Sequence, residues 1–294
     1  MIDVIKHKNI YLGVSLALVV LSWALVGFLG LKPGIDLVGG TVWQIDAPEA
    51  DLDEVRSVLN ENGAADFQIK IAGDGSFIIR LKDLSEENHQ GYLRALQDEF
   101  PAVTEMNFSS IGPTIGSELR RSSIWAIILV LIGISLYVAF AFRKVSEPVK
   151  SWKYGLITLL TLLHDVSIPA GLLAVLGEWK GIEIDTNFIV ALLVVMGFSV
   201  HDTIVVFDRV RENLQLFRGR NTPLGEIVNR SVNETIARSI NTSLTLVLVL
   251  LALMVFGPAP LFYFVLTILF GTVVGTYSSI FVASPMLYLW QKKR

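Results

Sequence analysis

The sequence GFSVHDTIVVFDRVREN at residues 197–213 places two ionisable side chains, His201 and Asp202, inside an apolar run that begins near residue 187. A run of this length can cross a bilayer as a helix. An ionisable residue near the centre of a spanning helix costs about 2.5–3.5 kcal/mol on insertion scales, so we expect these side chains to serve a function. The alternative is structural: a carboxylate that pairs with a cation only to pack two helices.

The composition of the 294-residue chain is typical of a membrane protein. Its residues are 52% hydrophobic without glycine, whereas soluble domains reach about 45–50% with glycine counted. The chain has no cysteine and its four histidines lack metal-site spacing, so we expect neither disulfides nor a metal or cofactor. A net charge of -3 without a basic, aromatic-rich patch argues against a nucleic-acid partner. The sequence has no nucleophile elbow and no Walker loop, and we expect no enzymatic activity.

Six apolar runs have the length of a membrane-spanning helix. The first is too long for a signal-peptide core and lacks a cleavage pattern, so we expect it to remain as a helix. The sequence therefore predicts a multi-pass α-helical membrane protein with six transmembrane helices. The six runs cover residues 10–31, 123–142, 154–177, 187–207, 239–256 and 262–290.

Lysine and arginine indicate the orientation, because positive charge is retained on the cytoplasmic side. The short segments on the amino-terminal side of the membrane are rich in both, whereas the opposite connections, 178–185 and 257–261, hold only Lys180. We therefore expect a protein of the cytoplasmic membrane with both termini in the cytoplasm. Residues 1–31 would form the cytoplasmic start and first helix, residues 32–121 an extracytoplasmic domain, and residues 122–294 the remaining five helices.

The pattern of residues 32–121 predicts a ferredoxin-like α+β domain in the order βαββαβ. The expected strands are 41–46, 66–72, 76–82 and 103–110, and the expected helices are 51–62 and 85–100. His89 lies among polar residues on the second helix, and we interpret it as a solvated surface residue. The glycines of GIDLVGGT at 34–41 permit close backbone approach, which favours a turn over a phosphate-binding loop. We expect this domain to bind or to act as a lever, without chemistry of its own.

Polar side chains recur at helical spacing on three of the predicted spanning helices, where residues three or four apart share a face. Three helices would therefore carry polar stripes inside lipid. The stripes are Thr158, Thr161 and Asp165 with His164 beside them; Ser199 and Asp202 with Gly197 and His201 on the neighbouring face; and Arg238, Asn241, Thr242 and Thr245.

Asp202 is the residue that we expect to carry the coupling ion. Burial disfavours the charged form of a carboxylate and a nearby guanidinium favours it. Arg238, expected at the cytoplasmic start of the fifth helix, has a side chain long enough to reach toward Asp202. A movement that replaces water by Arg238 beside Asp202 would change the protonation of the carboxylate, and would thus couple ion passage to a shift of helices. Three points stay open: Arg238 could extend to the interface instead, Asp165 could be a structural group or a relay, and Pro169 could supply a hinge.

The sequence SVHDTIVVFDRVREN at residues 199–213 resembles the fourth-helix signature of the SecF family, whose members pair with SecD in bacterial protein export. Four further stretches resemble motifs of the same family and occur in the same order. They are GIDLVGGT at 34–41, IGPTIGSEL at 111–119, LLHD at 162–165 and NETIARSINTSLT at 233–245. The resemblance extends over nearly the whole chain.

This resemblance implies one half of a twelve-helix unit of the resistance-nodulation-division superfamily, with SecD as a separate chain supplying the other six helices. It implies use of a proton or sodium gradient to draw unfolded polypeptides outward beside the SecYEG channel, with YajC and YidC as further partners. By motif position, Asp202 corresponds to the family's essential aspartate and Arg238 to its conserved arginine. Many relatives carry asparagine at the position of His201, which leaves open whether His201 joins the ion path or only replaces an amide hydrogen bond.

Two other functions compete with gradient-coupled export. The chain could be half of a small-molecule exporter of the same superfamily, although such pumps carry larger external domains and both six-helix halves in one chain. It could also be a structural membrane scaffold in which Asp202 and Arg238 only hold helices together.

Overall fold

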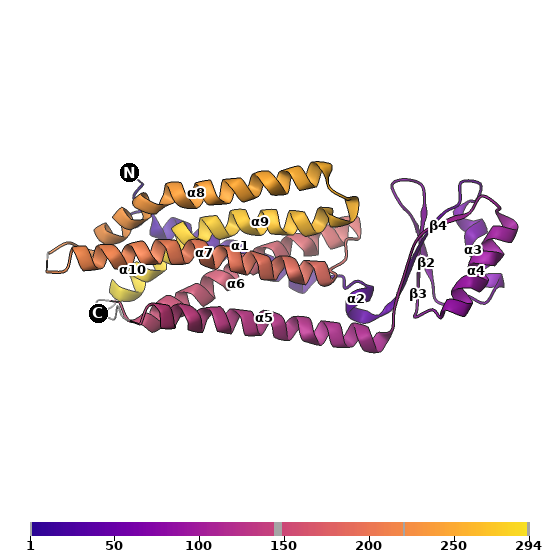
Figure 1. Ribbon diagram of the computed structural model, residues 1–294, viewed down its shortest axis with the longest axis horizontal. Coiled ribbons are helices and arrows are strands. Elements are labelled where there is room, and N and C mark those ends of the chain that lie inside the picture. Colours follow the sequence, from indigo (N-terminus) through magenta and orange to yellow (C-terminus); the bar gives the residue numbers. More distant parts are fainter. Residues whose placement is uncertain (1, 144–148, 220, 293–294) are drawn as a thin grey trace. The chain divides into compact units, whose positions relative to one another are not determined.

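The computed structural model describes residues 2–143, 149–219 and 221–292 (Figure 1). The chain separates into two compact units. Met1–Lys32 and Trp125–Arg294 form the first, and Pro33–Ile124 form the second. Each unit has its own buried apolar core.

The first unit is helical, and within the described residues six helices are long and apolar enough to cross a membrane. This confirms the multi-pass helical fold. Five spans are α1 (Lys8–Leu29), α5 (Pro113–Ala141), α6 (Ser151–Lys180), α7 (Thr186–Leu216) and α8 (Leu224–Phe256). The first turns of α5, up to Ile124, belong to the second unit. The last span follows the 3₁₀ turn η1 (Ala259–Leu261) and combines α9 (Phe262–Ser278), the π-helical turn η2 (Ser279–Ala283) and α10 (Ser284–Lys292).

Helices α7 and α8 extend well beyond their predicted ends at residues 207 and 239. The additional turns carry charged residues that hydrogen-bond across the two helices. Arg209 on α7 donates to Glu234 on α8 at 2.7 Å, and Asn213 donates to the same carboxylate at 2.8 Å. The predicted ends of both helices, which rested on hydropathy alone, lie too far inside the helices, because the additional turns are polar and are stabilised by these contacts.

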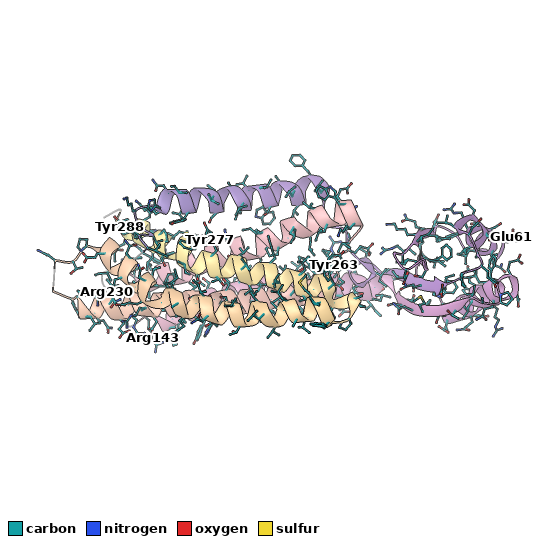
Figure 2. The ribbon with its side chains drawn as sticks, turned by 90° about the horizontal axis from the view of Figure 1, so that it is seen from above. Glu61, Arg143, Arg230, Tyr263, Tyr277 and Tyr288 are labelled. Carbon is teal, nitrogen blue, oxygen red and sulfur yellow. The ribbon has the colours of Figure 1, made fainter. Side chains whose placement is uncertain are left out.

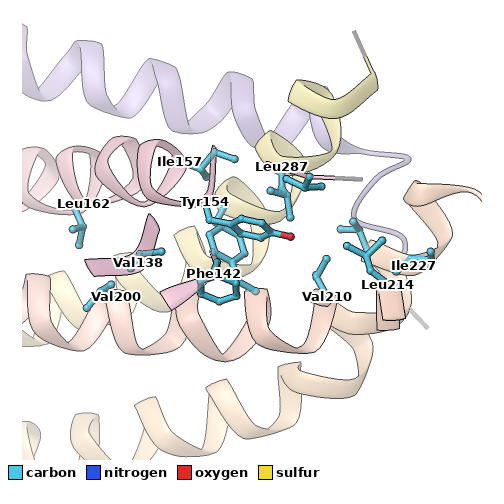
Figure 3. Close-up of a cluster of buried hydrophobic side chains, with 14 of the residues drawn as sticks. Val138, Phe142, Tyr154, Ile157, Leu162, Val200, Val210, Leu214, Ile227 and Leu287 are labelled. Atoms are coloured by element: carbon cyan, nitrogen blue, oxygen red, sulfur yellow. The ribbon is translucent and has the colours of Figure 1, made fainter. Parts of the chain in front are cut away.

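An aromatic cluster fills the core of the first unit where α5, α6 and α7 meet (Figure 3). Phe142 stacks on Tyr154 with ring centres 4.8 Å apart, and Phe207 meets Tyr154 edge to face at 5.2 Å. All three side chains are buried. This cluster anchors the start of α6 and the middle of α7, the two helices that carry Asp165 and Asp202.

The second unit contains a four-stranded antiparallel sheet with strand order β2-β3-β1-β4 and two longer helices, α3 and α4. Trp43 on β1 pairs with Ile79 on β3 and Phe108 on β4, and it is fully buried with Leu59 of α3 and Leu96 of α4. The order of elements is the predicted one. The bounds are β1 (Gly40–Asp46), α3 (Leu52–Glu61), β2 (Gln68–Ile71), β3 (Phe77–Leu81), α4 (Glu86–Glu99) and β4 (Thr104–Ile111).

The two glycine-rich junctions at the base of the second unit pack against each other. The first includes a short helix, α2 (Ile35–Val38), which the turn interpretation did not include. Gly39 has a φ of 81°, and a Cβ there would lie 2.6 Å from Cα of Pro113. A Cβ on Gly116 would lie 2.4 Å from the backbone N of Gly39. Glycine is therefore required at both positions so that the two backbones can touch.

His89 is buried, so its prediction as a solvated surface residue was wrong. It is 2% exposed, its Nε2 lies 2.6 Å from Oε2 of Glu105, and its ring stacks on Phe108 at 3.6 Å. The indole Nε1 of Trp43 donates to the same Glu105 oxygen at 2.9 Å. The polar neighbours of His89 in sequence concealed that it shares the inward face of α4 with Leu96, two turns later.

We expect His89→Ala to destabilise the second unit by about 2 kcal/mol, because it removes the stack on Phe108 and one partner of a partly buried carboxylate. Hydrogen exchange of the β1 amides should become about 30-fold faster. His7→Ala, which removes an exposed imidazole in the first unit, is the matched control. Equal exchange rates in the two variants would show that His89 does not stabilise the sheet.

Candidate functional site

Asp165 is fully buried on α6 and is tightly hydrogen-bonded. Its Oδ1 lies 2.8 Å from Nδ1 of His164. Its Oδ2 accepts from the Ser199 hydroxyl of α7, and it also accepts from the Ser278 hydroxyl of α9 at 2.8 Å. Both carboxylate oxygens thus have partners, as a buried polar group requires. Asp165 ties α6, α7 and α9 together.

Asp202 is buried on α7 but is held more loosely than Asp165. It is 2% exposed, and Oγ of Ser243 on α8 lies 3.5 Å from its Oδ2, at the limit of a hydrogen bond. The hydroxyls of Ser239 and Thr276 lie close by; the first has no hydrogen-bond partner among the described residues and the second contacts Ser243. Ser243 makes its shorter contacts elsewhere, at 2.5 Å to Thr276 and 2.8 Å to the Ser239 carbonyl. The carboxylate of Asp202 therefore has capacity for another partner.

The two carboxylates belong to linked clusters. Ser199 and Asp202 lie three residues apart on α7, and Thr276 and Ser278 lie two residues apart on α9. Ser199 and Ser278 therefore bond Asp165, whereas Thr276, on the same helix as Ser278, lies beside Asp202. A movement of α9 relative to α7 would alter both environments together.

The π-helical turn η2 begins directly after Ser278. The Ser284 hydroxyl, just after this turn, donates to the carbonyl of Ser279 at 3.3 Å. Such turns occur often at functional sites, because they change the direction of side chains within an otherwise regular helix. Here the turn lies beside the hydroxyl that holds Asp165.

The side chains of Arg238 and His201 do not form part of this buried cluster, although His201 is next to Asp202 in sequence. Both side chains are exposed, on α8 and α7 respectively. In the part of the chain that the structure describes, no carboxylate oxygen lies within 4.0 Å of the Arg238 guanidinium. The structure thus does not bring Arg238 to Asp202. Arg238 is also far from the start of its helix, because α8 begins at Leu224.

The inward polar face of α8 differs from the predicted stripe. Asn241 and Thr245 are exposed like Arg238, whereas Ser239 and Ser243 are buried. Sequence reasoning missed Ser243, Thr276 and Ser278. The signal that was available is the spacing of four between Ser239 and Ser243, which places both on one face beside α7.

The predicted stripe on α6 is buried, but its hydroxyls serve their own helix. Thr158 donates to the carbonyl of Tyr154 at 2.9 Å, and Thr161 donates to that of Thr158 at 2.9 Å. Hydroxyls of this kind commonly bond a carbonyl one turn earlier. Of this stripe, only Asp165 with its neighbour His164 contributes to the polar cluster.

Small residues bring α7 and α9 close enough for these contacts. A Cβ on Gly271 would lie 2.3 Å from Cγ2 of Val195, and a Cβ on Gly275 would lie 2.9 Å from Cβ of Ser199. Close approach at small residues is the usual way in which membrane helices pack. Gly275 therefore sets the distance at which Ser199 and Ser278 can share Asp165.

We expect Gly275→Val to lower the free energy of unfolding by about 1–3 kcal/mol, because the added methyl groups overlap Ser199. Thermal unfolding of the full chain in detergent measures the loss. Gly133→Val on α5 is the matched control, since nothing lies within 4 Å of its Cβ position. If both variants unfold at the same temperature, α7 and α9 are not held at this distance.

The chemistry that the site supports is the binding and release of a proton or a hard monovalent cation. Carboxylate and hydroxyl oxygens are ligands for hard cations. Among the described residues, no group of three or more His, Cys, Asp or Glu side chains could hold a metal ion.

Residues 92–293 match the family model described as protein export membrane protein SecD/SecF, C-terminal. The protein translocase subunit SecF of Thermobaculum terrenum is 41% identical, over 100% of this chain and 95% of that protein. The subunit SecF of Synechocystis sp. is 35% identical, over 96% of this chain and 89% of that protein.

A solved structure extends the similarity to the fold. The crystal structure of SecDF from Thermus thermophilus, described as a translocon-associated membrane protein, matches 100% of this chain with a TM-score of 0.83 and 36% identity. The match covers 39% of that longer chain.

Proposed function

Because the chain belongs to the SecD/SecF family of protein-export membrane proteins, we propose that it is the SecF-type half of a two-chain complex. This complex would use an ion gradient to promote the late stage of protein export across the cytoplasmic membrane. The role in Sec protein export follows from the family, whereas the coupling to a gradient is inferred from the site.

The observation that carries the coupling is the environment of Asp202. A carboxylate that is 2% exposed, with the Ser243 hydroxyl 3.5 Å away at the limit of a hydrogen bond, is poorly compensated for the loss of water. A proton or a cation supplies the missing compensation. Asp165, with partners on both oxygens, needs no such ion, and we assign it a positioning role for α9. The carboxylate of Asp202 with neighbouring hydroxyls suits either a proton or Na⁺.

The exposed polar side chains of α7 and α8 favour a partner within the membrane. His201, Arg238, Asn241 and Thr245 are exposed on segments of spanning length. Polar residues on spanning helices face other helices or water-filled cavities, and seldom lipid. We propose that the six helices of a SecD chain cover this face. The SecDF protein of Thermus thermophilus supports this arrangement, since this chain aligns with 37% of its length.

The mechanism that we propose is an alternation at Asp202. With an ion bound, the carboxylate is neutralised and Ser243 and Thr276 keep their mutual contact at 2.5 Å. After release, the negative charge attracts Arg238, which neutralises it in a second state. Thr276 and Ser278 lie on the same helix, so the rearrangement would reach Asp165 and the turn at η2. His201, beside Asp202, would lie along the route of the ion at the partner interface.

The second unit would transmit this movement to the exported chain. We propose that it is a ferredoxin-like domain, which its order of elements and its antiparallel sheet, β2-β3-β1-β4, support. The distribution of Lys and Arg supports a location of this domain outside the membrane, with both termini in the cytoplasm. There it would meet unfolded polypeptides that leave SecYEG, with YajC and YidC as neighbours. We propose a lever function without covalent chemistry.

Depletion of the chain from cells tests the proposed function. Pulse-labelled secretory precursors should accumulate on depletion, and re-expression should restore their export. Efflux of lipophilic dyes, measured in the same cells, should not change. Normal export combined with lost dye efflux would instead identify a small-molecule exporter.

A further inference from the structure

A cavity of about 960 Å³ lies between α1, α6 and the final span, away from the contacts of Asp202. Its size is at the upper end of pockets that hold whole small molecules, roughly 300–1,000 Å³. Leu12, Leu16, Val19 and Trp23 line it from α1, and Leu160 and Leu163 are among the residues that line it from α6. The cavity is thus lined mainly by apolar side chains.

The few polar side chains at the wall do not favour water as the occupant. Ser167 donates to the carbonyl of Leu163 at 2.5 Å, and Ser15 donates to the hydroxyl of Tyr277 at 3.3 Å. His164 uses Nδ1 for Asp165, and its Nε2 is buried without a partner among the described residues. A bound water needs two to four polar partners. The wall therefore suits an apolar occupant.

The length of the cavity favours a lipid chain over a partner helix as its occupant. Leu12 and Trp23 are the outermost lining residues on α1, and eleven residues of helix span about 16 Å. This is close to one leaflet of the roughly 30 Å hydrocarbon core, whereas a spanning helix needs the full thickness. Trp290 lines the cavity from the last turns of α10 and lies beside Trp152, at 5.7 Å between ring centres. Tryptophans of this kind mark the interface between lipid and water.

Lys8 is the basic residue one helical turn before Leu12, the first lining residue of α1, and so shares its face. Its Nζ donates to the carbonyl of Ile5 at 3.3 Å and lies 5.8 Å from the ring centre of Tyr288 on α10. Figure 2 shows Tyr288 and Tyr277 on the final span. An ammonium has three donors, so Lys8 can also bind a phosphate oxygen.

We propose that this cavity binds one phospholipid of the cytoplasmic leaflet, with an acyl chain between α1 and α6 and its anionic headgroup at Lys8. The lipid would contact His164, the side chain that holds Oδ1 of Asp165. Occupancy would thereby stabilise α1 against α6 beside the polar cluster. This lipid site is separate from the ion site and does not depend on the proposed function.

Native mass spectrometry of the full chain tests the site, after extraction from vesicles of equal parts phosphatidylglycerol and phosphatidylethanolamine. The parent chain should retain one phospholipid, with phosphatidylglycerol preferred. Val19→Trp, which fills the cavity, should retain at least about fivefold less. Val20→Trp is the matched control, because Val20 is the next residue on α1 and does not line the cavity. Lys8→Gln should remove the preference for phosphatidylglycerol, whereas Lys6→Gln should keep it.

Three results would overturn the lipid site. The first is absence of a retained phospholipid from the parent chain, and the second is equal retention by Val19→Trp and Val20→Trp. The third is a Lys8→Gln variant with an unchanged headgroup preference. If Val19→Trp instead lowers the amount of a co-purified membrane protein while lipid retention stays constant, a partner helix occupies the cavity.

Discussion

An Asp202→Asn variant is expected to lose most of the export that depends on the ion gradient, by about tenfold or more, which corresponds to ~1.4 kcal/mol. Asparagine keeps the size of the side chain and its contact with Ser243, but it cannot exchange a proton and holds a cation poorly. The measurement is the rate at which pulse-labelled precursors leave the cytoplasm of cells that carry the variant. Asp202→Glu, which keeps the carboxylate and lengthens the side chain, should retain part of the activity.

The matched control for Asp202 lies on the same helix. Asp208 is exposed and pairs with Arg211 at 3.2 Å, three residues later. Exposed pairs of this kind contribute little, and Asp208→Asn should export at the parent rate. Both variants must be present in the membrane at the parent amount. If Asp202→Asn also exports at the parent rate, Asp202 is a structural residue and the chain acts as a scaffold.

The second large effect is expected from Arg238→Lys. Arginine presents a planar fork that can make two parallel hydrogen bonds to a carboxylate, and the compact ammonium of lysine cannot reproduce it. We expect gradient-dependent export to fall at least about fivefold, the lower end of typical coupling energies. The same precursor assay measures it, together with the amount of SecD that co-purifies with the chain.

Arg230→Lys is the control for this charge-preserving change. Arg230 also lies on α8, but its Nε bonds the carboxylate of Glu234 at 2.9 Å and half of its side chain is exposed. Its replacement should leave export unchanged. If Arg238→Lys also exports at the parent rate, Arg238 makes no close pair with Asp202 or with the partner, and only its positive charge matters.

The sequence predicted the fold correctly in the segments where one physical signal dominated. Apolar length identified the six spans, and alternation with turn residues identified the order of strands and helices in the second unit. The lengths of α7 and α8 were underestimated, because their outer turns are stabilised by ion pairs of Glu234 with Arg209 and Arg230. The burial of His89 was missed because its neighbours in sequence are polar, and its partners Phe108 and Glu105 lie on a distant strand.

The two carboxylates of the candidate site were predicted from the sequence, whereas their hydroxyl partners Ser243, Thr276 and Ser278 were not. A buried Asp in an apolar helix is visible in sequence, and both Asp165 and Asp202 are buried in the structure. The rotation of α8 that turns Ser243 inward and Arg238 outward follows from packing against α7 and α9. The π-helical turn after Ser278 likewise has no sequence signature that a regular period of 3.6 residues would reveal.

The central claim is that Asp202 couples an ion gradient to export, and a comparison in vesicles tests it most directly. Vesicles that contain the translocase, SecD and either the parent chain or Asp202→Asn would export a labelled precursor, with the gradient intact or collapsed by an ionophore. Collapse should slow export by the parent chain to the rate of Asp202→Asn and leave that variant unaffected. An equal slowing of both by the ionophore would contradict the claim, because the gradient would then act without Asp202.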